Sequence, residues 1–181
     1  MNDDDDDAAP TAVWETTEEL TEYKHPENPM ISFVELPGMG TPKYPHLQTF
    51  CEKINVDVYD VFLILTSTRF TGNDLELARK VKSMRKLFFL VRTKIDVSCD
   101  AERRRKRSAR FDEILKRIRD DCMANVQIFL GSDDHVFLIS NYHRDKWDFE
   151  RLAEAIYAQL PKDQGEVLIP FPKAGGKSFL L

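Results

Sequence analysis

The chain has 181 residues, of which 42% are hydrophobic and 31% are charged, and its net charge is −5. This length fits one domain with tails, and the composition excludes a fully disordered, collagen-like or fibrous chain. No apolar run reaches about 18 residues, so the sequence predicts no transmembrane helix.

Acidic residues are concentrated at the N-terminus. Residues 1–30 hold ten acids and one base, a net charge of −9, which leaves +4 on the remainder. Five consecutive aspartates are the reverse of the basic start of a secretory signal, so we expect an intracellular, cytoplasmic chain with an acidic disordered leader over residues 1–9. The three cysteines are scattered and show no metal-ligand spacing with the histidines, which indicates free thiols.

The first predicted elements follow this acidic segment. The short apolar run Met30–Leu36 predicts a strand, and Pro37-Gly38-Met39-Gly40 is a turn signal behind it. Residues 41–56 predict a helix, because apolar side chains recur there at spacings of three and four. The residues on that face are Leu47, Phe50, Cys51 and Ile54.

The middle of the chain alternates between apolar runs and amphipathic segments. Val61–Leu65 and Leu87–Val91 are continuous apolar runs, which are typical of strands buried on both faces of a parallel sheet. Between them we expect a helix over residues 73–84 with Asn73 as its cap. Residues 92–96 are predicted to form a loop.

The rest of the chain continues the alternation. A charge run over residues 100–110 is predicted as an exposed loop, followed by an amphipathic helix over 110–129, a strand over 136–139, a helix over 147–160 that begins at Asp148 or earlier, and a tail over 161–181. This order predicts an α/β fold of three layers, with helices on both faces of a mainly parallel sheet. We expect that sheet to contain residues 30–36, 61–65, 87–91 and 136–139.

Ligands of such folds bind beyond the carboxyl ends of the strands, which directs attention to three loops. They are Glu35-Leu36-Pro37-Gly38, Thr93-Lys94-Ile95-Asp96 and Ser140-Asn141. A carboxylate such as that of Asp96 accepts two hydrogen bonds from guanine, whose donor pair adenine lacks. Backbone N–H groups at Ser140 and Asn141 suit the guanine carbonyl oxygen, and Gly38 allows a close approach to a γ-phosphate.

Longer phrases of the sequence resemble the immunity-related, interferon-inducible GTPases. They are Pro10 to Thr17, Tyr23 to Pro26, Asn28-Pro29, Leu36 to Pro42, Tyr59-Asp60, Thr68 to Phe70, Asn73-Asp74, Phe88 to Asp96, and Val136 to Tyr142 followed by Trp147-Asp148-Phe149. The resemblance covers about residues 8 to 170. It implies a Ras-like P-loop NTPase G domain over residues 10–160, GTP or GDP with Mg²⁺ as ligands, GTP-dependent assembly with other family GTPases, and action in innate defence at endomembranes.

The resemblance also implies roles for single residues. Thr93, Lys94, Asp96, Ser140 and Asn141 would bind the guanine base. Glu35 would serve Mg²⁺ and Gly38 the γ-phosphate. Thr16 or Thr17 would be the switch I residue for catalysis and Mg²⁺, and spacing does not choose between them or exclude Thr11.

Three departures from the family pattern shape our expectations. The switch I-like segment begins near residue 10, which leaves no room upstream for the phosphate-binding loop G-x4-G-K-S, so we expect an N-terminally truncated G domain that is inactive or very weak alone. The Mg²⁺-binding aspartate of the family is replaced by Glu35. The C-terminal helical domain of the family is not in this sequence. Gly176-Lys177-Ser178 does not restore the loop, because position 171 is Phe171.

Two other functions remain open at this point. The chain is alternatively a non-catalytic interaction module that pairs with intact family GTPases. The basic run Arg103 to Arg107 raises a lesser hypothesis of binding to nucleic acid or to an anionic membrane surface.

Overall fold

A computed structural model describes residues 20–25, 31–39, 42, 44–130 and 135–159. The chain forms two compact units. One unit is Asp57–Leu160, and the other combines Met1–Val56 with Pro161–Leu181. The candidate base-binding loops fall within the first of these units.

The unit Asp57–Leu160 is built on a parallel sheet of three described strands in the order β3-β4-β5. These strands are β3 (Val61–Thr66), β4 (Leu87–Arg92) and β5 (Val136–Leu138). In register, Val61 lies opposite Leu87, and Leu90 lies opposite Val136. The central strand β4 is buried from Phe88 onward. The three apolar runs were therefore predicted correctly as strands. Burial on both faces holds for β4 and β5, whereas buried and half-buried residues alternate along β3.

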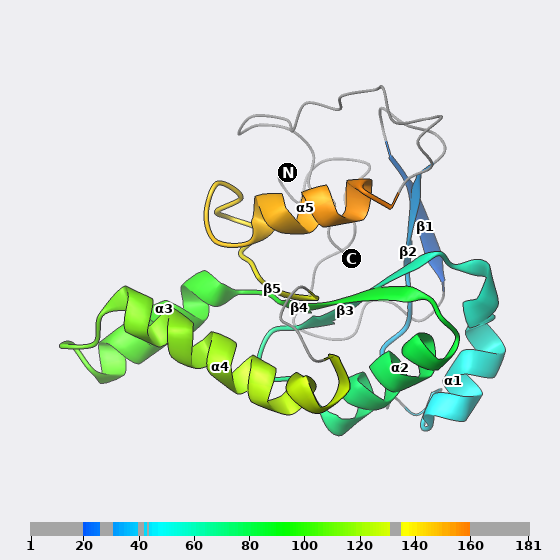
Figure 1. Ribbon diagram of the computed structural model, residues 1–181, viewed down its shortest axis with the longest axis horizontal. Helices are drawn as coiled ribbons and strands as arrows, with labels where there is room; N and C mark the ends of the chain where they lie inside the picture. Colours follow the sequence, from blue (N-terminus) through cyan, green and yellow to red (C-terminus); the bar gives the residue numbers. More distant parts are fainter. Residues whose placement is uncertain (1–19, 26–30, 40–41, 43, 131–134, 160–181) are drawn as a thin grey trace. The chain divides into compact units, whose positions relative to one another are not determined.

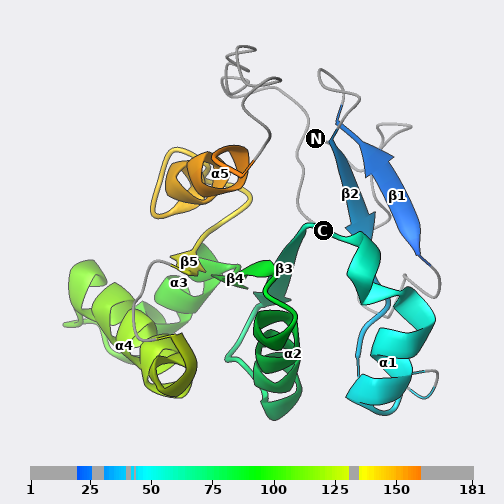
Figure 2. The same cartoon turned by 45° about the vertical axis from the view of Figure 1, so that its right-hand side comes forward.

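Helices cover both faces of this sheet (Figures 1 and 2). The helices α2 (Gly72–Ser83) and α4 (Phe111–Leu130) lie on one face, and α5 (Phe149–Tyr157) lies on the other. Core side chains from the strands and helices are almost fully buried, among them Val81, Leu90, Val126, Phe137 and Leu152. The predicted three-layer α/β fold with a parallel sheet is thus the observed one.

The start of α2 differs from the prediction. Thr71, and not Asn73, is the N-cap residue: its Oγ1 accepts a hydrogen bond from the Asp74 N–H at 3.3 Å, while the Thr71 N–H donates to Asp74 Oδ2 at 2.7 Å. This reciprocal pair is a capping box, which satisfies two backbone donors at once. Asn73 instead lies inside the first turn and is exposed.

The charge run is also different from the prediction, because its first half is helical. The helix α3 (Ile95–Arg105) begins directly after the β4 loop. Ile95 and Cys99, four residues apart, are completely buried and anchor one side of it. Three arginines lie in its last turn, where the partial negative charge of the helix end favours cations. Ile95 and Cys99 thus anchor a helix in which most of the other residues are charged.

The other unit contains β1 (Thr21–Lys24), β2 (Ser32–Glu35) and α1 (Leu47–Ile54), and a 3-10 turn at Val56–Val58 follows. β1 and β2 pair antiparallel, with Thr21 opposite Glu35. The expectation that residues 30–36 join the parallel sheet is wrong, since the described strands form two separate sheets. α1 confirms the predicted helix, with Phe50 and Ile54 buried on its inner face. In the described part of the chain, no helix is both long and apolar enough to cross a bilayer.

Candidate functional site

The loop after β4 is fixed to the neighbouring strand by Thr93. Its N–H and its Oγ1 both donate to the Thr66 carbonyl oxygen, at 2.8 Å and 3.2 Å. Lys94 follows with φ 55° and ψ 38°, in the left-handed region that costs a non-glycine residue about 1–2 kcal/mol. This conformation turns the chain abruptly from strand into helix, and strained residues of this kind cluster at functional sites.

Asp96 lies in the first turn of α3, just beyond this turn of the chain. Its Oδ1 is buried and has no hydrogen-bond partner among the described residues. Buried polar atoms in folded proteins are almost always hydrogen-bonded, so this carboxylate oxygen calls for a donor that the described residues do not supply. A ligand with an N–H group would satisfy it.

The loop after β5 lies directly against the Asp96 loop. The Ile139 N–H donates to the Arg92 carbonyl at 2.9 Å, and the Ile139 carbonyl accepts from the Ile95 N–H at 3.2 Å. Ser140 is fully buried, and its Oγ accepts from the Tyr142 N–H at 3.3 Å, so its hydroxyl organises the loop. Asn141 is exposed, and its backbone N–H has no partner in the described part of the chain. The structure therefore brings Asp96 and the Asn141 amide to one edge of the sheet.

Two other predicted site residues, Glu35 and Gly38, belong to the other compact unit of the chain. Glu35 ends β2, where it accepts a hydrogen bond from the Tyr23 hydroxyl at 3.5 Å. Burial and the negative charge of Glu35 both raise the pKa of Tyr23. Gly38 is exposed in the turn that follows β2. Thr16 and Thr17 lie outside the described residues. The described residues contain no group of three His, Cys, Asp or Glu side chains that could hold a metal ion.

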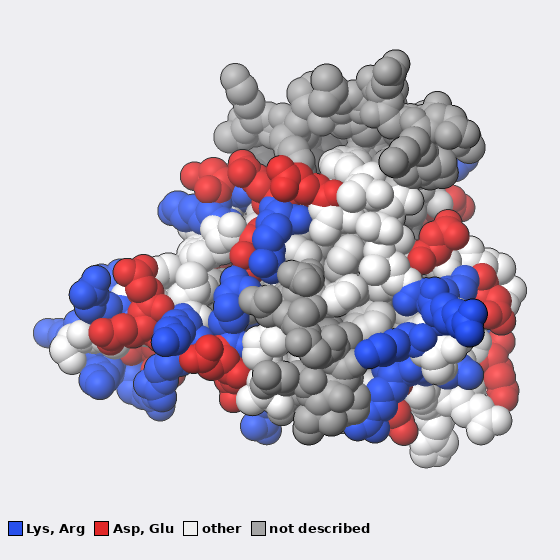
Figure 3. Space-filling view, in the orientation of Figure 1, with Lys and Arg blue, Asp and Glu red and all other residues white. Residues whose placement is uncertain are grey.

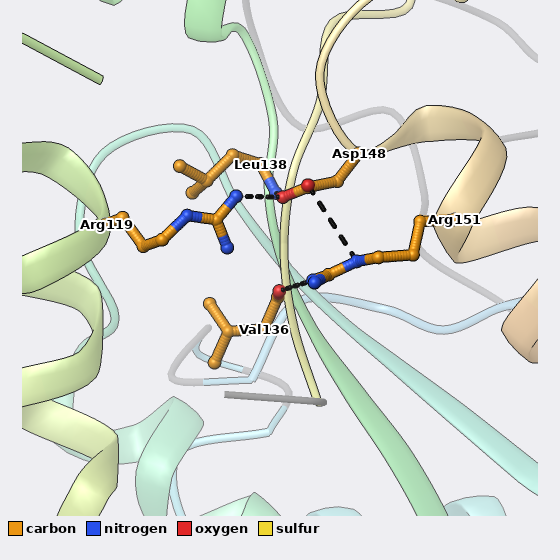
Figure 4. A network of polar contacts seen from close by, with 5 residues as sticks. All are labelled: Arg119, Val136, Leu138, Asp148 and Arg151. Carbon is orange, nitrogen blue, oxygen red and sulfur yellow. Dashed lines mark hydrogen bonds and ion pairs between the residues drawn. The ribbon is translucent and has the colours of Figure 1, made fainter. Parts of the chain in front are cut away.

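Sequence reasoning missed an ion-pair network behind the β5 loop, which we call the Asp148 clasp (Figure 4). Asp148 Oδ2 accepts from the Leu138 N–H at 2.8 Å and from Arg119 Nη2 at 2.6 Å. The Asp148 N–H donates back to the Leu138 carbonyl at 3.1 Å. Arg151 Nη2 donates to the Val136 carbonyl at 2.5 Å and its Nε lies 3.8 Å from Asp148 Oδ1. A family-typical Trp-Asp-Phe helix start was the only available signal.

Arg92 also supports α3, the helix that carries Asp96. Arg92, at the end of β4, is 9% exposed, and its Nη2 donates to Ser98 Oγ in the first turn of α3 at 3.2 Å. Its Nε is buried without a partner among the described residues. Burial lowers the pKa of this guanidinium, while nearby Cys122 and Asp121 act in the opposite direction. The turn that carries Asp96 is therefore held by a buried side chain.

The basic residues that end α3 are exposed. Arg105 pairs with Glu102 at 2.9 Å, and Arg110 lies 3.8 Å from Asp112. Figure 3 shows acidic and basic side chains interleaved over this end of α3 and α4. This mixed surface gives no specific support to a nucleic-acid site.

The parallel sheet, its helices and the loops at its carboxyl edge are those of a Ras-like G domain. The family profile described as Interferon-inducible GTPase (IIGP) matches residues 1–170. The chain therefore belongs to the interferon-inducible GTPase family.

Individual relatives agree with the family match. The chain is 38% identical over 161 residues to the T-cell-specific guanine nucleotide triphosphate-binding protein 2 of Mus musculus, which covers 88% of this chain and 39% of the relative. It is 33% identical over 167 residues to Interferon-gamma-inducible GTPase 10 of Mus musculus, and this match covers 92% of the chain and 40% of the relative. Interferon-inducible GTPase 1 of the same species is 34% identical over 163 residues, covering 89% and 39%. The chain thus spans about two fifths of the length of these curated relatives.

Proposed function

We propose that this chain binds guanine nucleotides and reads the base at the carboxyl edge of its parallel sheet. The observation that carries the proposal is the buried Oδ1 of Asp96, for which the described part of the chain provides no hydrogen-bond partner. Guanine offers a ring N–H and an exocyclic amine side by side, which match the two oxygens of one carboxylate, whereas adenine lacks this donor pair. The exposed Asn141 N–H, on the adjoining loop, suits the guanine carbonyl oxygen.

Lys94 and Thr93 complete the proposed base site. The left-handed backbone of Lys94 lets its long apolar stem lie along the plane of a base while the ammonium group stays in water. Thr93 contributes by fixing the loop to β3 through its two hydrogen bonds to Thr66. Ser140 acts through its backbone and its loop-forming hydroxyl, since its side chain is fully buried.

We propose that Glu35 binds Mg²⁺, that Gly38 contacts the γ-phosphate, and that Thr16 or Thr17 is the switch I residue. Mg²⁺ is held in nucleotide sites by one or two carboxylates together with phosphates and waters, so a single carboxylate is compatible with it. The bound ion would supply charge neutralisation at the phosphates. Glu35 is held by the Tyr23 hydroxyl, which would orient the carboxylate.

The parent activity in this proposal is GTP hydrolysis, in innate defence at intracellular membranes. The printed 181 residues contain no G-x4-G-K-S or G-x4-G-K-T pattern. Backbone amides and a lysine of such a loop supply most of the charge stabilisation in phosphoryl transfer. We therefore expect this 181-residue polypeptide, assayed alone with Mg²⁺, to show no GTP turnover.

The base-site proposal is tested by calorimetric titration with guanosine, adenosine and xanthosine. An amide at position 96 offers one donor and one acceptor, which suits xanthine better than guanine. We expect Asp96→Asn to lower guanosine affinity by about tenfold or more, the worth of a charge-assisted hydrogen bond, and to raise xanthosine affinity. Asp100→Asn, an exposed change on the same helix, is the matched control. Equal affinity for guanosine and adenosine in the unaltered chain would refute the proposal.

The alternative function, an interaction module that pairs with intact family GTPases, predicts a different result. Such a module would associate with an intact relative and show no base preference. GTP turnover that disappears in Asp96→Ala would contradict our expectation of inactivity and would direct attention to Gly176-Lys177-Ser178 as a phosphate site.

A further inference from the structure

We infer that Asp148 is a positioning residue for recognition of the guanine carbonyl, because it closes the loop that presents the Asn141 N–H. The inference rests on the proposed function and extends it to a residue that would not touch the nucleotide. Asp148 acts through the loop over residues 139–147, whose two ends it joins.

The two ends of the loop are joined by a double hydrogen bond between one pair of residues. The Asp148 N–H donates to the Leu138 carbonyl at 3.1 Å, and the Leu138 N–H donates to Asp148 Oδ2 at 2.8 Å. The loop therefore leaves and returns to the sheet at a single fixed point. Both bonds would have to break before the loop could shift as a whole.

The carboxylate of Asp148 serves the loop and not the helix that it precedes. Asp148 is the N-cap residue of α5, yet its side chain makes no capping hydrogen bond to that helix. Aspartate at this position ordinarily accepts from the second or third helical N–H. Here the oxygen is turned toward Leu138, as Figure 4 shows. A capping hydrogen bond therefore does not explain its location at the helix start.

An ion pair locks this carboxylate against α4. Arg119 Nη2 lies 2.6 Å from Asp148 Oδ2, and the two side chains are only 27% and 13% exposed. Charge-assisted hydrogen bonds of this kind are the strong ones, and low exposure protects them from screening. Arg151 is a weaker neighbour, because its closest approach to the carboxylate is 3.8 Å.

The far side of the loop is held by aromatic contacts. Trp147 adopts a left-handed backbone with φ 57° and stacks on Phe111 of α4, with ring centroids 5.9 Å apart. The His143 ring packs edge-on against Trp147 at 5.8 Å. With its ends joined and this side packed, the loop presents Asn141 from a fixed frame.

A backbone hydrogen bond also fixes this loop relative to Asp96. The Ile139 carbonyl, one residue into the loop, accepts from the Ile95 N–H, and Ile95 directly precedes Asp96. Asp96 would read the amine side of guanine and Asn141 the carbonyl side. Loss of the clasp should therefore weaken the carbonyl contact and leave the Asp96 contact unchanged.

Three nucleosides separate these two contacts. Inosine lacks the exocyclic amine and reports on Asp96, whereas 6-thioguanosine keeps both donors but has a thiocarbonyl, a weak acceptor, in place of the oxygen. The guanosine to 6-thioguanosine affinity ratio therefore measures the carbonyl contact. The guanosine to inosine ratio measures the Asp96 contact. Both ratios are obtained with the full 181-residue chain by calorimetry.

We expect Asp148→Asn and Arg119→Met to lower the guanosine to 6-thioguanosine ratio by about threefold to tenfold, the worth of one neutral hydrogen bond. The guanosine to inosine ratio should not change. Glu150→Gln and Arg117→Met are the matched controls, because both residues are exposed and lie on the same helices. Hydrogen exchange of residues 139–147 should accelerate in the two clasp variants and not in the controls.

Each other result overturns a stated part of the argument. If the clasp variants bind guanosine and both ratios are unchanged, or all three affinities fall by the same factor, Asp148 has only a structural role. If the unaltered chain binds no guanosine, the proposed function fails and this inference fails with it. Should Asp148→Asn not fold, Arg119→Met decides the question alone, because it keeps the Asp148 side chain and removes the ion pair that locks this carboxylate against α4.

Discussion

The two compact units of the chain differ in how their strands are stabilised. In Asp57–Leu160, β4 is a buried central strand, with Phe88, Phe89, Leu90 and Val91 at most 3% exposed. In the other unit, β1 and β2 have four residues each, and all of these are exposed or half-exposed. An isolated two-stranded hairpin is marginally stable in water, whereas a helix-covered sheet builds its own core.

The residues proposed for the nucleotide site are divided between the same two units. The residues proposed for the base lie at strand ends of the buried sheet, where backbone hydrogen bonds hold their loops. The residues proposed for Mg²⁺ and the γ-phosphate lie on or beside the exposed hairpin. The proposed base recognition thus involves residues of the unit with the buried sheet, which is why we expect it to persist in this polypeptide.

The largest expected difference between the units comes from a pair of side-chain truncations, one in a strand of each unit. Leu90→Ala removes a fully buried side chain from β4 and should lower the free energy of unfolding by about 3–4 kcal/mol, through lost burial and the cavity left behind. Val34→Ala, in half-buried β2, should cost less than about 1.5 kcal/mol. Urea unfolding followed by circular dichroism measures both, and equal losses would remove the distinction between the units.

A smaller effect separates the helix starts of the two units. Thr71 closes a capping box on α2, so Thr71→Ala should cost about 1 kcal/mol. His46 precedes α1 without any side-chain capping bond, so His46→Ala should change stability by less than about 0.5 kcal/mol. The same urea titration compares them. A larger loss at His46 than at Thr71 would show that capping does not distinguish these helices.

The sequence predicts the strands of this sheet well because each of them has a local pattern. β3, β4 and β5 are continuous apolar runs, and α4 has an apolar side chain every three or four residues. The helix α3 was missed because its charged residues outnumber the two buried ones, Ile95 and Cys99, that fix it. β1 was missed because a polar four-residue strand is defined only by its partner β2.

The candidate site shows the same limit. Motif and strand order place Asp96 and Asn141 at the sheet edge, which local sequence can indicate. The Asp148 clasp joins residues 29 positions apart, Arg119 and Asp148. Asp148 lies in the Trp147-Asp148-Phe149 phrase, but no spacing in the sequence links it to Arg119. Similarly, the buried and unpaired Oδ1 of Asp96 is a consequence of tertiary packing. The groups that position the loops are therefore visible only in three dimensions.

The smallest effect concerns two cysteines, one in each of the two units. Cys99 in α3 is completely buried, whereas Cys51 in α1 is half-exposed. Burial, with a lesser contribution from Asp100 and Asp96, raises the pKa of the Cys99 thiol from 9.0 to about 11. At pH 8 about one Cys99 thiol in a thousand is then ionised, and the thiolate is the reactive form. Iodoacetamide should therefore modify Cys51 well before Cys99 in the folded chain, as mass spectrometry of tryptic peptides would show.

The raised pKa of Cys99 also predicts a pH dependence of stability. In the unfolded chain this thiol ionises near pH 9, but in the folded chain it stays protonated until about pH 11. Its contribution is complete below pH 9 and is lost as the pH rises toward 11, because the unfolded state releases its proton first. The free energy of unfolding should therefore fall between pH 9 and 11, and fall less steeply in Cys99→Ala, with Cys51→Ala as the control. Identical slopes in the unaltered chain and Cys99→Ala would mean that the interior around Ile95 and Cys99 opens to water, which would weaken the buried anchor that α3 provides for Asp96.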